Sequence, residues 1–266
     1  MDYSPQRIIC LTEEVTEAIY CLGASDRIVG ISGFVMHPPK ARKEKPKVST
    51  FIKADIEKII GLKPDLVIGF SDLQADIAQK LIKNGITVWI NNYRSVQGIF
   101  KMMMQLGGLL NKTKEAKAWI QTCRDEIDAI KKEVAQWPSQ PSVYFEEWND
   151  PIITGIQWVG EIIELAGGID VFPELSSESL AKNRILSDPN EVVKRNPDII
   201  MASWCGKKFK KEKLINRPNW SNIKAVREDH IYEIPSNNIL QAGPAALKEG
   251  LTHIHEICKK WVLQKR

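Results

Sequence analysis

The sequence predicts an α/β protein of two Rossmann-like lobes with mostly parallel sheets, joined by one long helix. Short apolar runs alternate with helical patterns along the chain, which is typical of parallel sheets. A helix, a Pro-Asp turn and an apolar run occur at 55–69 and again at 188–202, half a chain later. Between these repeats, 111–137 contains neither glycine nor proline and keeps one helical period throughout. The fold class therefore follows from alternation, repetition and one uninterrupted helix.

The N-terminal lobe is predicted to span 1–110. Its expected strands are short apolar runs with the sequences RIICL, RIVGIS, DLVIGF and TVWIN. The helices expected between them lie near 12–22, 54–62, 72–84 and 95–110. Pro64 ends the second helix, because the residue before a proline is disfavoured in the helical region. The following strand is apolar throughout, as a strand covered on both faces should be.

The linking helix is predicted over 111–137. Apolar or small residues recur along it with the 3.6-residue period of an amphipathic helix. At 1.5 Å per residue it is about 40 Å long. We expect a stiff connection that leaves a ligand cleft between the lobes and permits only modest closure on binding.

The C-terminal lobe is predicted to span 138–266. Its expected strands are SVYFE, DIIMAS and HIYEIP, with helices near 157–167, 188–195 and 244–262. A second repeated pattern supports the duplication. A helix, a glycine that ends it and a strand are expected both at 12–32 and at 155–174. Each half therefore reads as one α/β unit used twice.

Composition excludes several classes of protein. The net charge is only +4, and the basic residues are interspersed with 33 acidic ones, so no nucleic-acid partner is predicted. The lysine-rich run at 207–213 is interpreted as a solvated loop or helix face, with an anion or partner patch as the alternative. No apolar stretch is long enough to span a bilayer.

Five cysteines occur without CxxC or zinc-finger spacing, so the sequence predicts free thiols, no metal and no cofactor. Free thiols are commoner in reducing compartments. The first residues, MDYSPQRIICL, lack the features of a secretory signal. Two locations stay open: the cytoplasm, or a periplasmic or membrane-associated site if a signal was trimmed. We expect a monomer.

Aromatic side chains follow nearly every predicted strand. In parallel sheets, ligands bind outside the carboxyl ends of the strands. The residues found there are Phe34, Phe70, Tyr93, Trp148 and Trp204, with Trp158 just beyond. A group of rings at these positions favours a pocket for a bulky, flat ligand.

Several stretches together resemble a known family. They are RIVGISGF followed by HPP, KVSTFIKADIEKIIGLKPDLVIGF, the linking helix, YFEEWNDPIITG, WVGEIIELAGG and NPDIIMAS. In this order and spacing the chain resembles the class III substrate-binding proteins of ABC transporters, which carry cobalamin, haem and ferric siderophores. It is most similar to the cobalamin-binding branch. The resemblance implies non-catalytic binding of a corrinoid or another metal chelate for uptake through an ABC permease.

The resemblance also implies roles for single residues. Phe51 takes the place of a tryptophan that faces the corrin, and Glu57 and Glu191 take the places of acidic residues that dock on the permease. The last ligand loop departs from the branch, because Asn237 and Gln241 stand near the positions of an acid and an arginine. Amides can bind a neutral ligand but cannot neutralise an anionic siderophore. The full set of predicted ligand contacts is Phe34, His37, Phe51, Phe70, Tyr93, Glu147, Trp148, Trp158, Arg184, Trp204, Cys205, Asn237 and Gln241.

Two alternative functions stay open. A cytoplasmic metabolite-binding protein of the same fold fits the free thiols, and an enzyme would use Cys205 or Glu147. A thiol nucleophile needs a base and a lowered pKa, and the sequence puts no histidine beside Cys205. Glu146 and Glu147 point to opposite faces of their strand, so acid–base work by the pair is not expected. One is expected to bind ligand and the other to pair with a lysine.

Overall fold

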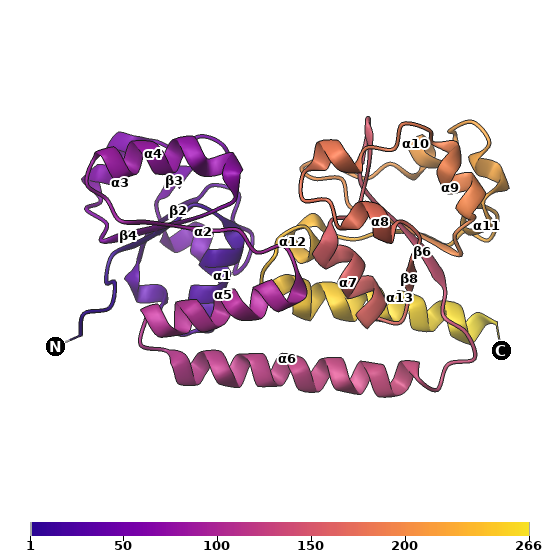
Figure 1. Ribbon diagram of the computed structural model, residues 1–266, viewed down its shortest axis with the longest axis horizontal. Coiled ribbons are helices and arrows are strands. Elements are labelled where there is room, and N and C mark those ends of the chain that lie inside the picture. The colour runs from indigo at the N-terminus through magenta and orange to yellow at the C-terminus, as the bar shows by residue number, and fades with distance from the viewer. Residues whose placement is uncertain (1, 266) are drawn as a thin grey trace. The chain divides into compact units, whose positions relative to one another are not determined.

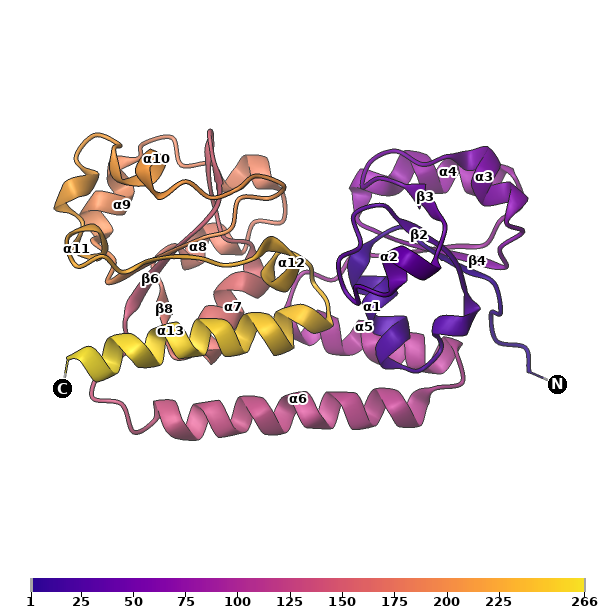
Figure 2. The same ribbon diagram turned by 180° about the vertical axis from the view of Figure 1, so that it is seen from behind.

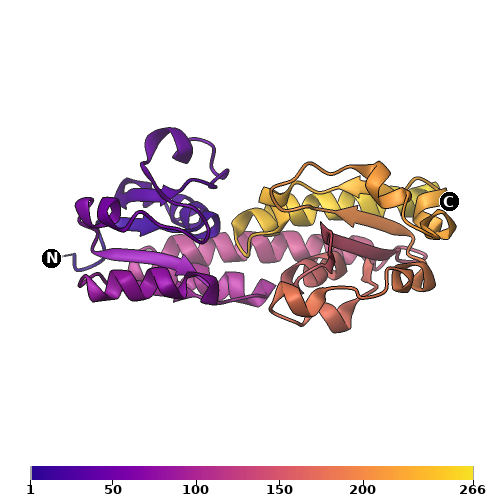
Figure 3. The same ribbon diagram turned by 90° about the horizontal axis from the view of Figure 1, so that it is seen from above.

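The computed structural model describes residues 2–265, which form two compact units. Unit 1 contains the chain up to Tyr93, together with Gln97–Thr122 and Gly243–Ala245. Unit 2 contains Arg94–Val96, Cys123–Ala242 and the chain from Ala246 onward. Figure 3 shows unit 1 mainly in indigo to magenta and unit 2 mainly in salmon to yellow. The domain boundaries given above stay a prediction.

Unit 1 is built on a parallel five-stranded sheet in the order β3-β2-β1-β4-β5. Its strands are β1 (Ile8–Cys10), β2 (Ile28–Ser32), β3 (Lys47–Ser49), β4 (Leu66–Phe70) and β5 (Val88–Asn91). The four strands expected from sequence are all present, and β3 is an addition. It was missed because its sequence, KVS, contains a single apolar residue and so shows no apolar run.

Helices cover both faces of this sheet (Figure 1). They are α1 (Glu13–Cys21), α2 (Ala41–Glu44), α3 (Ile56–Gly61), α4 (Ala75–Lys83) and α5 (Val96–Leu109). On one face, Ile59 of α3 and Leu81 of α4 pack against Val67 of β4 in a buried cluster. α1 and α5 lie on the other face. Because helices cover both sides, the central strands are apolar throughout.

Unit 2 contains a second five-stranded sheet, ordered β10-β9-β6-β7, in which β8 also pairs with β6. Its strands are β6 (Ser142–Asn149), β7 (Ile152–Thr154), β8 (Ile169–Asp170), β9 (Ile199–Ala202) and β10 (Ile231–Glu233). β7 runs antiparallel to β6, and the other pairs are parallel. The prediction of mostly parallel sheets is confirmed.

The helices of unit 2 also form two layers (Figure 2). They are α7 (Gln157–Leu165), α8 (Pro173–Ser176), α9 (Asn190–Arg195), α10 (Lys211–Ile215), α11 (Lys224–Arg227), α12 (Ser236–Ile239) and α13 (Leu251–Gln264). Val192 of α9 and Leu214 of α10 belong to a buried cluster that includes Tyr144 and Ile200 of the sheet. α7 and α13 lie on the opposite face (Figure 1).

The two sheets share a topology, which supports the repeat seen in sequence. β1 lies between β2 and β4, and β4 pairs with β5. In unit 2, β6 pairs with β8 and β9, and β9 pairs with β10. The helix–strand repeats at 55–69 and 188–202 contain α3–β4 and α9–β9, at equivalent places in the two sheets.

The long helix α6 runs over Thr113–Val134. It is shorter than the predicted 111–137, because Asn111 has a positive φ of 57° and the chain leaves the helix after Val134. In unit 2, the end of α6 lies along α13. Glu133 pairs with Lys259 at 2.8 Å and faces His255, whose ring stacks on Trp137. Among the helices described, none combines the length and apolar character needed to cross a bilayer.

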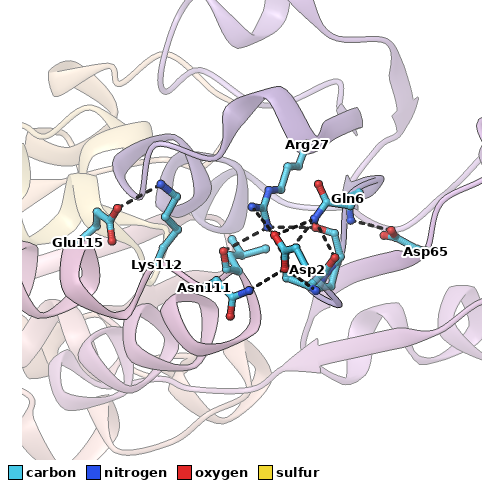
Figure 4. Close-up of polar contacts among 10 residues, drawn as sticks. Asp2, Gln6, Arg27, Asp65, Asn111, Lys112 and Glu115 are labelled. Carbon is cyan, nitrogen blue, oxygen red and sulfur yellow. Dashed lines mark hydrogen bonds and ion pairs between the residues drawn. The ribbon is translucent and has the colours of Figure 1, made fainter.

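The N-terminal segment is fixed to the amino-terminal edge of the unit 1 sheet (Figure 4). Asp2 accepts a hydrogen bond from Asn111 at 2.7 Å and pairs with Arg27 at 3.5 Å. The backbone N–H of Gln6 donates to Asp65 at 2.6 Å. Gln6 precedes β1 and Asp65 precedes β4, so these contacts lie at the opposite end of the strands from their carboxyl termini.

Candidate functional site

Exposed apolar side chains gather at the carboxyl ends of the unit 1 strands. Phe34 follows β2, Ile52 follows β3 and Leu73 follows β4; their exposed fractions are 63%, 61% and 56%. Met36, on the loop of Phe34, is also exposed. We call these four residues the apolar rim. Because β3, β2, β1 and β4 are neighbours and parallel, the rim residues emerge at one edge of the sheet. A grouped apolar surface of this kind marks a binding site more often than scattered exposed residues do.

Three predicted aromatic contacts lie half-buried beside the apolar rim. Phe51 and Phe70 are at the exits of β3 and β4, and Tyr93 follows β5. The hydroxyl of Tyr93 accepts a hydrogen bond from Gln105 at 3.1 Å, which fixes the orientation of its ring. Unit 1 therefore combines half-buried rings with exposed apolar side chains at one sheet edge.

The loop of His37 is held by a carboxylate that sequence reasoning missed. Glu13, in the first turn of α1, accepts hydrogen bonds from the backbone N–H groups of Met36 at 2.9 Å and His37 at 2.8 Å. Burial raises the pKa of Glu13, and the two backbone hydrogen bonds oppose that rise. Glu13 thereby positions the loop that carries Phe34 and His37.

A shallow concavity of about 670 Å³ also lies on unit 1. It is lined by Ser71, Asp72, Ala75, Ala78, Gln79, Ile82, Lys83, Ile90 and Asn92. Its walls come from α4 and from the exits of β4 and β5. None of the predicted contacts lines it, although Phe70 and Tyr93 are sequence neighbours of its rim.

In unit 2, the predicted contact Trp204 lies in the interior. It is 3% exposed, and its indole N–H donates to Glu146 at 3.0 Å. Glu146 is fully buried within β6, opposite Ala202 at the end of β9, and also accepts from Tyr144 at 2.9 Å and from Arg217 at 2.6 and 2.9 Å. This network fixes the exit of β9 to the middle of β6.

Glu147, the residue after Glu146 in β6, forms a second ion pair, with Arg184. Their closest atoms are 2.6 Å apart, and Arg184 is 1% exposed and also donates to the carbonyl of Thr154. The expectation of a lysine partner for one glutamate was wrong, since Glu146 and Glu147 each pair with an arginine. The planar guanidinium suits a carboxylate in a buried site better than an ammonium does.

Trp148, near the end of β6, and Cys205, which follows β9, are more accessible than Glu146 and Trp204. Lys207 Nζ lies 4.1 Å from the centroid of the Trp148 ring, and the indole N–H donates to the carbonyl of Asp150 at 2.8 Å. Cys205 is exposed as a residue, but partial burial of its thiol, and secondarily the Glu147 carboxylate, raises its pKa. A raised pKa keeps the thiol protonated, which disfavours a nucleophilic role.

The remaining predicted contacts differ in accessibility. Trp158, on α7, is 4% exposed, and its indole N–H donates to the carbonyl of Ile239 at 2.8 Å. Asn237 and Gln241, in and after α12, are half-buried, and Asn237 donates to Asn238 at 3.0 Å. Trp158 is therefore buried within the fold, whereas the side chains of Asn237 and Gln241 are partly exposed.

The two predicted docking residues lie in the first turns of short helices. Glu57 is exposed on α3. Glu191, on α9, pairs with Lys194 at 2.5 Å. Within residues 2–265, no cluster of three or more His, Cys, Asp or Glu side chains is arranged to hold a metal ion.

Comparisons with known proteins agree with the fold. A family model described as periplasmic binding protein matches residues 8–238. The vitamin B12-binding protein of Vibrio campbellii is 27% identical, with 98% of this chain and 92% of that protein covered. The uncharacterized ABC transporter substrate-binding lipoprotein YvrC of Bacillus subtilis is 26% identical, with 95% and 79% covered.

Solved structures show the same architecture. A possible iron-binding, periplasmic solute-binding protein from Staphylococcus epidermidis superimposes with a TM-score of 0.81 at 23% identity, covering 96% of this chain and 98% of that one. The periplasmic vitamin B12 binding protein of Vibrio cholerae gives a TM-score of 0.77 at 20% identity, with 99% of both chains covered. The similarity predicted from the sequence is confirmed at the level of family and fold.

Proposed function

Because the chain belongs to the periplasmic binding protein family, we propose that it is the substrate-binding component of an ABC uptake system. Its ligand is a bulky, largely uncharged molecule with amide and apolar groups, of which a corrinoid is the best fit. Binding is non-catalytic. The candidate ligand contacts of each unit lie at or near the carboxyl ends of its strands.

The observation that carries this proposal is the division between exposed apolar groups and neutralised charges. The apolar rim of unit 1 exposes Phe34, Ile52 and Leu73, which suit a large apolar face. In unit 2, the guanidinium groups of Arg184 and Arg217 are already engaged by glutamates of β6. An anionic chelate would have to compete with those glutamates, and a neutral one would not.

The partly exposed amide side chains of unit 2 are suited to a neutral ligand. Asn237 and Gln241 offer amide donors and acceptors without net charge. In unit 2, the Nζ of Lys207 lies over the ring of Trp148. The set matches a ligand with peripheral amides more closely than one with several carboxylates.

Accessibility selects among the predicted contacts. The strongest candidates are the exposed or half-buried members: Phe34, His37, Phe51, Phe70, Tyr93, Glu147, Trp148, Cys205, Asn237 and Gln241. Trp158, Trp204 and Arg184 are buried and have partners within the fold, so their role is structural.

Two surface acids complete the proposal. Glu57 and Glu191 contact the permease, with Glu191 exchanging Lys194 for a permease cation. The protein works outside the cytoplasm as a monomer. Reversing both charges, in Glu57→Lys with Glu191→Lys, should abolish transport in a reconstituted system while leaving ligand affinity unchanged; unchanged transport would exclude this role.

Titration tests the ligand class. Tryptophan fluorescence should be quenched by cyanocobalamin and by cobinamide, with Trp148 as reporter, and only weakly by haem. A Trp148→Phe variant is the control, because it should bind but lose much of the signal. Haem binding tighter than both corrinoids would overturn the neutral-ligand assignment.

A further inference from the structure

Gln74 is a fully buried polar side chain that joins three strand exits of unit 1. Its Oε1 accepts a hydrogen bond from the backbone N–H of Phe70 at 2.9 Å. Its Nε2 donates to the carbonyl of Phe51 at 2.8 Å and to the carbonyl of Leu11 at 3.3 Å. These three residues lie beyond β4, β3 and β1 or at their last position. One side chain thus links the exit of β3 to the exits of β1 and β4, two strands with which β3 does not pair.

The backbone beside this side chain is strained. Ser71 has φ 61° and ψ 173°, a region that residues other than glycine seldom adopt. Ser71 is buried, its N–H donates to Asn91 at 2.8 Å, and its Oγ accepts from Leu73. Strained backbone persists only where surrounding contacts determine it, and it clusters at ligand-binding sites. Gln74 supplies two such contacts. Its Oε1 accepts from the N–H of Phe70, just before Ser71, and its own backbone N–H donates to the carbonyl of Ser71.

Gly69 makes room for the Gln74 amide. A Cβ on Gly69 would lie 2.4 Å from Gln74 Oε1 and 3.0 Å from Ile90 Cδ1. The amide cannot move aside without losing its hydrogen bonds to Phe70 and Phe51. Gly69, the penultimate residue of β4, and Gln74, four residues beyond Phe70, therefore act as a matched pair.

We propose that Gln74 is a positioning residue for ligand binding, which holds the Phe51 and Phe70 loops in their binding geometry before the ligand arrives. The inference rests on the proposed function, since Phe51 and Phe70 are ligand contacts only there. A preorganised site binds more tightly because less ordering entropy is lost on association. Removing the amide leaves the fold's apolar contacts in place and frees the two loops.

Two variants and one control separate positioning from general stability. Gln74→Met keeps similar volume and loses all three hydrogen bonds. Gln74→Glu keeps an acceptor for the Phe70 N–H and loses both donors, regaining one when its carboxyl is protonated. Gln79→Met is the matched control, because Gln79 is an exposed glutamine on α4.

Hydrogen exchange without ligand is the first measurement. In Gln74→Met, exchange should accelerate about tenfold or more in segments 49–53 and 69–73, because the three hydrogen bonds that hold them are lost. The control should match the parent protein. Unchanged exchange in both segments would overturn the proposal, and this outcome is independent of which ligand binds.

Ligand affinity is the second measurement, with cyanocobalamin as probe. Gln74→Met should bind about tenfold more weakly, and Gln74→Glu should recover part of that loss at pH 5 relative to pH 8, each compared with the parent at the same pH. Equal affinity of Gln74→Met and parent would overturn the positioning role. If the parent itself binds no corrinoid, the proposed ligand fails, while the exchange result still decides whether Gln74 holds the loops. If Gln74→Met does not fold, Gln74→Glu provides both measurements.

Discussion

Glu14 makes the stability of unit 1 depend on pH. Its side chain is 1% exposed in the first turn of α1, and Thr12 donates to its Oε1 at 2.6 Å. Its Oε2 has no hydrogen-bond partner. Burial raises the pKa of Glu14 from 4.5 to about 7, and the neighbouring Glu13 carboxylate adds a smaller rise. The folded protein therefore holds a proton that the unfolded chain releases near pH 4.5.

The sign follows from proton binding. Between pH 4.5 and 7 the folded state binds more protons than the unfolded state, so the free energy of unfolding falls as pH rises. A pKa shift of this size corresponds to about 3 kcal/mol, lost once the pH exceeds 7. Glu14→Gln has no proton to lose and should escape this fall. Relative to the parent protein, the variant should gain about 3 kcal/mol between pH 4 and pH 8.

Urea unfolding followed by tryptophan fluorescence at pH 4, 6 and 8 measures this gain. Glu57→Gln, an exposed change in the same unit, is the control and should shift little with pH. The comparison uses the difference between variant and parent, so that other titrating groups cancel. A Glu14→Gln difference that is constant from pH 4 to 8, or that shrinks as pH rises, would refute the reasoning.

Three further experiments test single contacts or residues. Gly69→Ala should lower the free energy of unfolding by about 1–3 kcal/mol in urea, because the added methyl group overlaps Gln74; an unchanged midpoint would mean that the amide moves freely. Glu146→Ala should cost about 3–5 kcal/mol by leaving the Arg217 guanidinium unpaired, and replacing Arg217 by leucine as well should recover part of the loss; additive losses would contradict this coupling. Iodoacetamide should alkylate Cys205 slowly at pH 7, as followed by peptide mass spectrometry, since the pKa of its thiol is raised; rapid alkylation of Cys205 would indicate a thiolate.

The strand exits were predictable because parallel sheets impose them. Once the RIVGIS and DLVIGF runs are recognised as buried strands of one parallel sheet, the residues at their carboxyl ends must emerge at one edge of that sheet. This placed Phe70 and Phe34 at the edge from sequence alone. The repeat was visible for the same reason, since both halves use a proline to stop a helix before a buried strand.

Long-range polar partners were not predictable. Arg184 lies 37 residues from Glu147, and Arg217 lies 71 residues from Glu146, so no local spacing indicates either pair. Trp158 shows the converse difficulty, because an indole on an amphipathic helix looks the same whether it faces a pocket or a core. One sequence feature is related to the Gln74 contacts. Gly69 stands near the end of an apolar strand, where a Cβ would overlap a neighbouring side chain.

Hydrogen exchange with and without cyanocobalamin tests the central claim most directly. We predict that ligand slows exchange at the strand exits of both units, in 33–37, 50–53 and 70–73 of unit 1 and in 147–149, 204–207 and 237–241 of unit 2. The N-terminal contacts of Asp2 and Arg27, at the opposite end of the unit 1 strands, should not change. Protection confined to that opposite end, or to the concavity along α4, would contradict a ligand site at the strand exits.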